Sequence, residues 1–425
     1  MRGLSKFGPE LRRRRLAAGM TLDGLAARVH YSKGQLSKVE TGVQRPTTEL
    51  ARLCDTALGA EGALAALVSP ATAPALLDRR RVLTAGAASA LALGVPSALA
   101  SPGTKVVERA ADGAGGPLVD GVRALFDQFR VLGQTAPSAA VLPALEAQTR
   151  ALPALAEGSG ARSARELYLL ASRFAEYTGW MAQESGDEHA ALTWTDHAVR
   201  LAAAGGDHHL EAYALVRRGL LTFYAGDARS TIAVVQGAQA GRLPARIRGL
   251  AAQREAQGHA LNGDRDACLR SLDRARALLE RAATDGSAGA LPVIGTTHLS
   301  DPTAMTNGWC LLDLGLPREA AEVLDREVTR IPTHATRTRV RYGVRRVLAH
   351  AVAGEVDHAC ALAVPLLGES EALASGTIRT DLRRLSRVLG RHPRNTNARA
   401  LAPRMAAALQ DTVPTTPARE AVPRG

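Results

Sequence analysis

Glycine followed by an acidic residue recurs at nearly regular intervals between residues 186 and 355 of this 425-residue chain. Each pair ends a long run with helical periodicity. The pairs are Gly186-Asp187, Gly226-Asp227, Gly263-Asp264 and Gly354-Glu355, with Gly315 as a variant. The five glycines lie 40, 37, 52 and 39 residues apart, and the longest interval contains a Gly/Thr/Pro-rich insert from Asp285 to Pro302. The spacing predicts a repeated unit of about 37 to 40 residues, in which two helices meet at the glycine.

The composition favours helices throughout. Hydrophobic residues make up 46% of the chain but aromatic residues only 3%, so the apolar content is mostly Ala, Leu and Val. Small residues such as Ala190 and Ala228 begin the second helix of a unit, where they let paired helices approach closely. An all-α fold is expected, with a stack of helical repeats over residues 117–410 and a flexible tail over residues 411–425.

The repeated unit resembles the tetratricopeptide-type helical repeat, whose usual length is about 34 residues. Its aromatic signature positions are met in part by Tyr168, Trp180, Tyr213 and Tyr224. Such stacks bury a continuous core and bind peptides or proteins on a concave surface. The resemblance implies an α-solenoid with a peptide or protein ligand.

Eight arginines in the repeat region are candidates for such a surface. They are Arg217, Arg218, Arg254, Arg337, Arg339, Arg341, Arg345 and Arg346. These side chains either attract an acidic peptide or form a solvated face, and a solvated face is the more common arrangement.

Positive charge gathers at the start of the chain. The first 60 residues hold 11 Lys/Arg against 5 Asp/Glu, so they contribute +6 of the formal net charge of +12. Such a density is typical of a phosphate-binding surface or of a solvated helix face. Charge alone does not separate the two, but the hydrophobic pattern does.

Four short helices are predicted in this basic region. The first runs from Pro9 to Ala18. Thr21 is expected to cap the second, and Ser32 the third, which ends near Thr41. The fourth runs from Thr47 to Leu58. Two short helices joined by a tight turn, the second with Lys, Gln and Ser near its start, fit the geometry that the DNA major groove requires.

The same stretch carries the frame LAxxVxxSxxxLSxxExGxxxP. Its residues are Leu25, Ala26, Val29, Ser32, Leu36, Ser37, Glu40, Gly42 and Pro46. Residues 1–70 thereby resemble the Cro/repressor-type (xenobiotic-response-element, XRE) helix-turn-helix domain of bacterial transcription regulators, a five-helix domain. With the repeats that follow, the chain resembles a class of actinobacterial regulators.

The resemblance implies roles for the residues around the third helix, which becomes the recognition helix. Ser32, Lys33, Gln35 and Lys38 are expected at or near base edges, where Gln pairs with adenine and Lys reaches guanine acceptors. Arg45, in the loop after this helix, is expected to meet a phosphate.

Three further positions follow from the same family pattern. Arg15 and Glu40 are expected to form a structural ion pair. Leu22 stands where the family often has a phosphate-binding Gln, so phosphate binding at the start of the second helix falls to its backbone amides and to Thr21.

A stretch of 19 residues without charge, Val82 to Ala100, follows three arginines. Its length is close to the roughly 20 residues that a membrane span needs, but seven of its residues are Ala and only six are Leu or Val. We therefore expect residues 71–116 to be a linker with an Ala-rich docking segment at 82–100. A single membrane span is the alternative.

No motif for catalysis or metal binding emerges. The four cysteines form no C-x-x-C pair, and the chain lacks a phosphate-loop, H-E-x-x-H or G-x-S-x-G motif. His208 and His209 point in different directions on a helix, and Tyr177, Trp180 and Met181 are either a stacking site or core residues. No catalytic residue, metal or cofactor is expected.

The sequence thus predicts a cytoplasmic, sequence-specific transcription regulator that binds double-stranded DNA. A homodimer is expected because one such domain recognises only a half-site. The repeats would dimerise and sense a ligand or peptide. The alternative is a partner-binding scaffold, membrane-tethered or cytosolic, in which the repeats are the working part.

Overall fold

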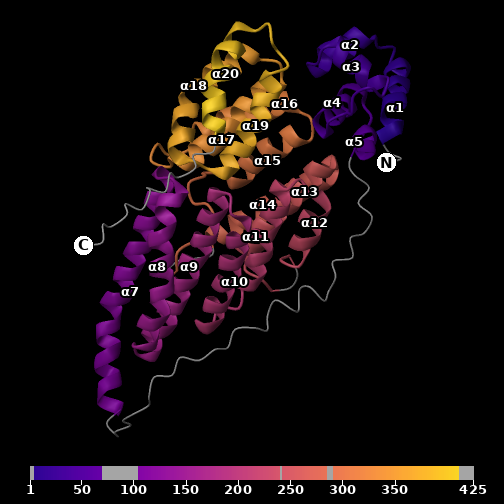
Figure 1. Ribbon diagram of the computed structural model, residues 1–425. Helices are drawn as coiled ribbons and strands as arrows, with labels where there is room; N and C mark the ends of the chain where they lie inside the picture. The colour runs from indigo at the N-terminus through magenta and orange to yellow at the C-terminus, as the bar shows by residue number, and fades with distance from the viewer. Residues whose placement is uncertain (1–3, 69–103, 240–241, 285–290, 411–425) are drawn as a thin grey trace, which may run out of the picture. The chain divides into compact units, whose positions relative to one another are not determined.

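The computed structural model describes residues 4–68, 104–239, 242–284 and 291–410. These residues form nineteen helices and no strand, which confirms the predicted all-α fold (Figure 1). The chain divides into two compact units, residues 1–119 with 158–164, and residues 120–157 with 165–425. We call residues 4–68 the N-terminal domain and the described residues of the second unit the repeat domain. The predicted docking segment at 82–100 and the tail at 411–425 lie outside the described residues.

The N-terminal domain consists of five helices. They are α1 (Leu4–Ala17), α2 (Leu22–Val29), α3 (Lys33–Glu40), α4 (Thr48–Leu58) and α5 (Ala63–Val68). The first helix begins earlier than predicted, with Pro9 inside it. Phe7 and Leu11 lie one helical turn apart and are both fully buried, so the core draws the helix toward the N-terminus.

A buried carboxylate positions the last of these helices. Asp55 of α4 accepts hydrogen bonds from the backbone amides of Leu64 and Ala65, each at 2.8 Å. Burial raises the pKa of Asp55, although these amides and the nearby arginines oppose the shift. The first turn of α5 is thereby tied to the core of the domain.

The helices from residue 104 onward follow one another in antiparallel pairs. They are α7 (Thr104–Thr135), α8 (Ser138–Glu157), α9 (Ala161–Ser185), α10 (Glu188–Ala204), α11 (Leu210–Tyr224), α12 (Ala228–Gln236), α13 (Ala245–Asn262), α14 (Arg265–Thr284), α15 (Pro302–Asp313), α16 (Pro317–Val328), α17 (Thr336–Val352), α18 (Val356–Leu373), α19 (Gly376–Leu389) and α20 (Thr396–Leu409). Each predicted turn glycine lies between the two helices of a pair, from α9 and α10 to α17 and α18. The five glycines have φ between 75° and 94°, a conformation that favours glycine.

Two other boundary predictions have different outcomes. Helix α7 begins at Thr104, inside the range 71–116 predicted as linker, so the linker prediction was wrong over residues 104–116. The run KVVERAA at 105–111 is rich in helix formers, and the prediction gave more weight to the glycines after it. Residues 291–301 of the predicted insert are not helical, as expected.

The two ends of the repeat stack are joined by a buried polar cluster. Glu184 of α9 forms an ion pair with Arg337 of α17, with Oε2 and Nη1 3.3 Å apart, and both side chains are 1% exposed. Glu184 also accepts hydrogen bonds from the hydroxyls of Ser375 and Thr377 at the start of α19, at 2.6 and 2.9 Å. Arg337 donates to the carbonyl oxygen of Gly133 in α7 at 2.7 Å.

These bonds join residues that are about 150 to 200 positions apart in the sequence. In an open solenoid each repeat contacts only its neighbours, so such bonds do not form. The stack therefore closes on itself, and α7 and α9 lie against α17 and α19. The open concave surface expected from the sequence becomes the interior of the domain.

None of the helices within the described ranges combines the length and the apolarity that crossing a bilayer requires. The four cysteines are buried as free thiols. No group of three His, Cys, Asp or Glu residues is placed to hold a metal ion in the part of the chain that the structure describes.

Candidate nucleic-acid interface

Helices α2 and α3 form a tight helix-turn-helix with both starts capped. The Thr21 hydroxyl accepts the Gly24 amide at 3.0 Å. Helix α2 ends at His30, whose φ of 53° turns the chain. Ser32 caps α3 by accepting the Gln35 amide at 3.2 Å. The two helices are thus short and rigid, and the turn between them is three residues long.

One face of this pair packs into the domain. Leu25, Ala26 and Val29 of α2 and Leu36 and Val39 of α3 are buried, each at most 6% exposed. The start of α3 and its other face remain accessible, with Ser32, Lys33 and Lys38 exposed. The helical period of the apolar residues therefore determines which side of α3 is available to a partner.

A buried ion pair fixes the end of α3 against α1. The Arg15 guanidinium donates to both carboxylate oxygens of Glu40, at 2.7 and 2.9 Å, and to the carbonyl oxygen of Met20 at 2.9 Å. The two side chains are 9% and 6% exposed, and the hydrogen bond to Glu40 raises the pKa of Arg15. The structure thus brings together the two residues expected to pair.

The same contact depends on a glycine. A Cβ atom at Gly8 of α1 would lie 2.5 Å from the carbonyl oxygen of Glu40, closer than a real Cβ atom comes. Gly8 therefore allows α1 to pack directly on the last turn of α3.

Two of the predicted base-contacting residues already have partners within the domain. The Lys33 ammonium lies 2.7 Å from the Asp23 carboxylate, with both side chains about two thirds exposed. The Gln35 side-chain oxygen accepts hydrogen bonds from the backbone amide and the hydroxyl of Ser32, at 3.1 and 3.2 Å. Gln35 therefore completes a capping box, and its amide nitrogen is the part left for a base.

Sequence reasoning missed both of these partners. The Ser-x-x-Gln spacing at positions 32 and 35 is the signal for a capping box and predicts the role of Gln35. Asp23 lies in the first turn of α2. Its pairing with Lys33 joins the first turns of two helices, which periodicity does not reveal.

Lys38 and Arg45 differ from Lys33. Both side chains are exposed, and neither forms a hydrogen bond or an ion pair within the described residues. Lys38 projects from the last turn of α3, and Arg45 lies in the loop that follows. Thr21 is also exposed, at the start of α2. These positions leave cationic groups and a helix N-terminus accessible on the α2 and α3 side of the domain.

Comparisons with known proteins agree with this geometry. Residues 6–68 match a family described as a helix-turn-helix domain, and the match covers α1 to α5. No curated protein and no solved structure matches the chain. The family match and the capped α2 and α3 pair lead to the same conclusion: the N-terminal domain is a helix-turn-helix domain, which supports DNA as a partner and a role as a DNA-binding regulator.

Proposed function

We propose that the chain is a sequence-specific transcription regulator of the Cro/repressor (XRE) type that inserts α3 into the major groove of DNA. The observation that carries this proposal is the placement of α3. Its inner face and its end are fixed by the apolar core and by the Arg15–Glu40 pair, while Ser32, Lys33 and Lys38 remain exposed. A rigid helix with exposed polar and cationic side chains suits direct contact with base edges.

The residues divide into two roles in this proposal. Ser32, Lys33, Gln35 and Lys38 contact bases, and Lys38 needs to give up no internal bond to do so. Arg45 contacts a phosphate, since it lies in the loop beyond the helix. The backbone amides at the start of α2, with Thr21, bind a second phosphate through the positive end of the helix dipole.

The repeat domain has the regulatory role. One helix-turn-helix domain covers only a half-site, so two copies of the chain are needed for a specific operator. We assign dimerisation and ligand sensing to the repeat domain, in line with its resemblance to tetratricopeptide-type repeats. A regulator of this design acts in the cytoplasm as a homodimer.

A competition experiment tests the assignment of the two roles. The full-length protein is first used to select its preferred site from random DNA. Lys38→Ala should then lose about 1 to 3 kcal/mol of binding free energy at particular base positions, while Arg45→Ala should weaken all sequences alike and reduce the salt dependence. Arg218→Ala, in the repeat domain, is the matched loss of charge and should leave binding unchanged. Failure to select any preferred site would refute sequence-specific recognition.

A further inference from the structure

The repeat domain encloses a cavity of about 150 Å³ in its interior. Side chains from α7, α9, α11, α13 and α17 line it, and residues 293–299 of the insert form one wall. The volume is on the scale of an engineered cavity that holds benzene, about 150 Å³. The cavity exists because the stack closes on itself, since an open solenoid would expose the same residues to solvent.

The insert is held over this cavity by two arginines. Arg246 of α13 donates to the carbonyl oxygens of Ile294 and Thr296, at 2.8 and 3.3 Å. Arg130 of α7 donates to the Thr297 hydroxyl at 2.5 Å. An extended peptide needs an open groove several residues long, so this enclosed site favours a small molecule instead.

The cavity lining carries excess positive charge. It includes five arginines, which are Arg130, Arg217, Arg254, Arg337 and Arg341, and one carboxylate, Glu176. Arg337 is neutralised by Glu184, which also lies 4.0 Å from Arg341. Glu176 accepts a hydrogen bond from the Tyr213 hydroxyl at 2.8 Å and lies 3.8 Å from Arg217. The charge of Asp381 also acts on Arg341, so three carboxylates compensate five guanidinium groups.

Arg254 is a lining cation without a carboxylate partner in the part of the chain that the structure describes. Its hydrogen bond goes to the neutral side chain of Gln257, and it forms no ion pair within the described residues. Burial lowers the pKa of Arg254, and the positive charge of Arg341 lowers it further. Arg254 is partly buried, and a partly buried cation without a counter-charge is energetically unfavourable, so an anion beside it would relieve this cost.

Three residues of the lining have unpartnered donors. Gln253 is 2% exposed and Arg217 is 5% exposed. The Gln253 side-chain nitrogen, Arg217 Nε and Arg341 Nε have no hydrogen-bond partner. Buried donors in folded proteins are nearly always paired, so three such donors beside Arg254 indicate a missing acceptor.

Aromatic side chains supply the rest of the lining. The rings of Tyr177 and Trp180 lie 5.2 Å apart, centroid to centroid. Phe126 packs against Tyr177 with centroids 5.9 Å apart. All three line the cavity. Of the cluster that the sequence left as core or stacking site, Tyr177 and Trp180 thus face the cavity, and Met181 is fully buried. Such a wall suits a flat or compact apolar group.

We propose that this cavity binds a small organic anion, in which a compact aromatic or apolar body carries one carboxylate or phosphate group. The acidic group lies at Arg217, Gln253 and Arg254, and the body lies against Tyr177 and Trp180. The inference deepens the sensing role proposed above and rests on it for its regulatory meaning. The binding itself is independent of DNA recognition.

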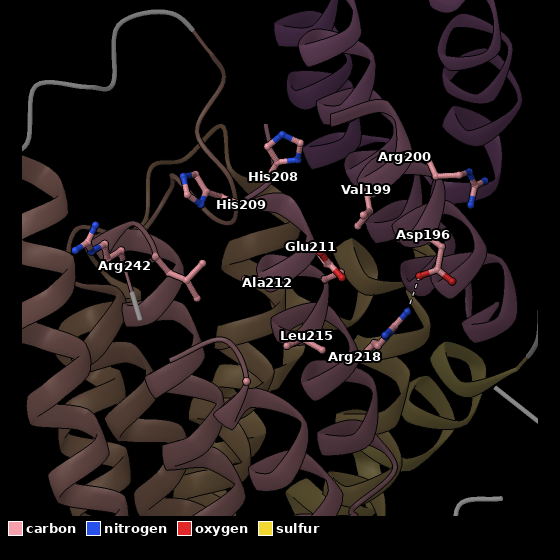
Figure 2. A pocket seen from close by; sticks show the side chains of 13 residues that line it. Asp196, Val199, Arg200, His208, His209, Glu211, Ala212, Leu215, Arg218 and Arg242 are labelled. Atoms are coloured by element: carbon pink, nitrogen blue, oxygen red, sulfur yellow. Dashed lines mark hydrogen bonds and ion pairs between the residues drawn. The ribbon is translucent and has the colours of Figure 1, made fainter. Parts of the chain in front are cut away.

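A second pocket of the repeat domain provides the contrast. Figure 2 shows it as an open groove, with His208, His209 and Arg242 around it and a bond between Arg218 and Asp196. Arg218 donates to Asp196 at 2.7 Å, and the two side chains are 44% and 48% exposed. This arginine is solvated and paired, so Arg218→Gln is a matched control for Arg254→Gln.

Thermal unfolding of the full-length protein tests the proposal. The probes are benzoate, phenyl phosphate, inorganic phosphate and the neutral benzamide. Benzoate or phenyl phosphate should raise the unfolding temperature more than benzamide does. Calorimetric titration should show at least tenfold weaker binding to Arg254→Gln and unchanged binding to Arg218→Gln. A response to inorganic phosphate alone would assign the site to the free ion and refute the organic body.

The variants also separate ligand binding from a structural role. Arg254→Gln removes a poorly compensated charge, so without an anion it should unfold at the same or a higher temperature than the wild type. The proposal is overturned if no anion raises the unfolding temperature, or if the rise persists in Arg254→Gln. Binding of the selected DNA site, measured on the same samples, tests the proposed function separately from this cavity.

Discussion

The two domains differ in where their key cationic side chains lie. In the N-terminal domain one ion pair, Arg15 and Glu40, is buried, while Lys33, Lys38 and Arg45 are exposed. In the repeat domain Arg337 and Arg345 are almost completely buried and bind carboxylates on other helices. Exposed cationic side chains suit contact with a large polyanion such as DNA. Buried arginines stabilise the closed stack, and in the proposed site they would bind a small anion. Net charge alone does not distinguish these two arrangements.

The largest loss of stability is expected at the buried polar cluster of Glu184 and Arg337. Arg337→Ala leaves Glu184 buried without its main counter-charge and should lower the stability of the repeat domain by about 3 to 5 kcal/mol. Arg339→Ala, which removes a half-exposed pair with Glu369, should cost less than about 1 kcal/mol. Denaturant unfolding followed by tryptophan fluorescence measures both, since Trp180, Trp194 and Trp309 all lie in this domain. Equal losses of stability in the two variants would show that the buried Glu184–Arg337 pair stabilises the domain no more than a surface ion pair does.

The substitution that removes the buried ion pair of the N-terminal domain is Glu40→Ala. It leaves Arg15 buried with only the Met20 carbonyl as acceptor and should cost roughly 3 kcal/mol. Glu10→Ala removes a partly exposed carboxylate that pairs with two arginines on its own helix, and should cost far less stability. Hydrogen exchange over residues 4–68 reports the effect in the full-length protein. Protection that stays at the wild-type level in Glu40→Ala would argue against a structural role for the pair.

A fall in pH should change the contributions of Glu184 and Asp55 to the stability of their domains in opposite directions. Burial raises the pKa of Glu184, but Arg337, Arg341 and two hydroxyls outweigh it, so the pKa is lowered from its ordinary value of 4.5. The unfolded chain then binds this proton first, and the contribution of Glu184 to stability is lost as pH falls below about 4.5. The pKa of Asp55 is raised above 3.8, so its contribution is present below that pH and is lost as pH rises through the raised value.

Unfolding measured between pH 3 and 6, about one unit or more on either side of these values, separates the two contributions. Glu184→Gln should weaken the acid sensitivity of the tryptophan signal. Asp55→Asn should weaken the opposite pH dependence of stability in the N-terminal domain, which hydrogen exchange measures. These assignments would be contradicted if the stability of both domains changed with pH in the same direction and did so in both variants as well.

The smallest effect is expected at the surface that we propose to contact DNA. Asp23→Asn removes the carboxylate that pairs with Lys33 and should raise DNA affinity a few-fold at low salt, because Lys33 becomes available to the nucleic acid. Asp196→Asn, which frees Arg218 in the repeat domain, is the matched control. Equal affinities for Asp23→Asn and the wild type across a salt titration would place Lys33 outside the interface.

Local patterns in the sequence predict much of this molecule. The caps Thr21 and Ser32 were predicted from spacings within a few residues, because capping depends on near neighbours. The five turn glycines were predicted from their recurrence after helical runs, because a left-handed turn at a helix end favours glycine. The helix start at Leu4 was missed because it depends on the burial of Phe7 in the tertiary core.

The interior of the repeat domain was not predictable in the same way. Arg337 and Arg341 were expected on a groove or a solvated face, and they line a closed cavity instead. Their partners, Glu184 and Tyr224, lie more than a hundred residues away in the sequence. A single sequence reveals periodicity within a helix pair, but it does not show which distant pairs meet when the stack curves.

The central claim is that α3 recognises specific DNA sequences, and genome-wide footprinting of the full-length protein beside Lys38→Ala tests it most directly. Lys38 is the best position for this control because it lacks internal partners within the described residues, so its loss should not disturb the fold. Discrete sites with a shared two-fold motif, weakened in Lys38→Ala, are the predicted result. Binding without a shared motif, or a pattern identical in the variant, would contradict the claim.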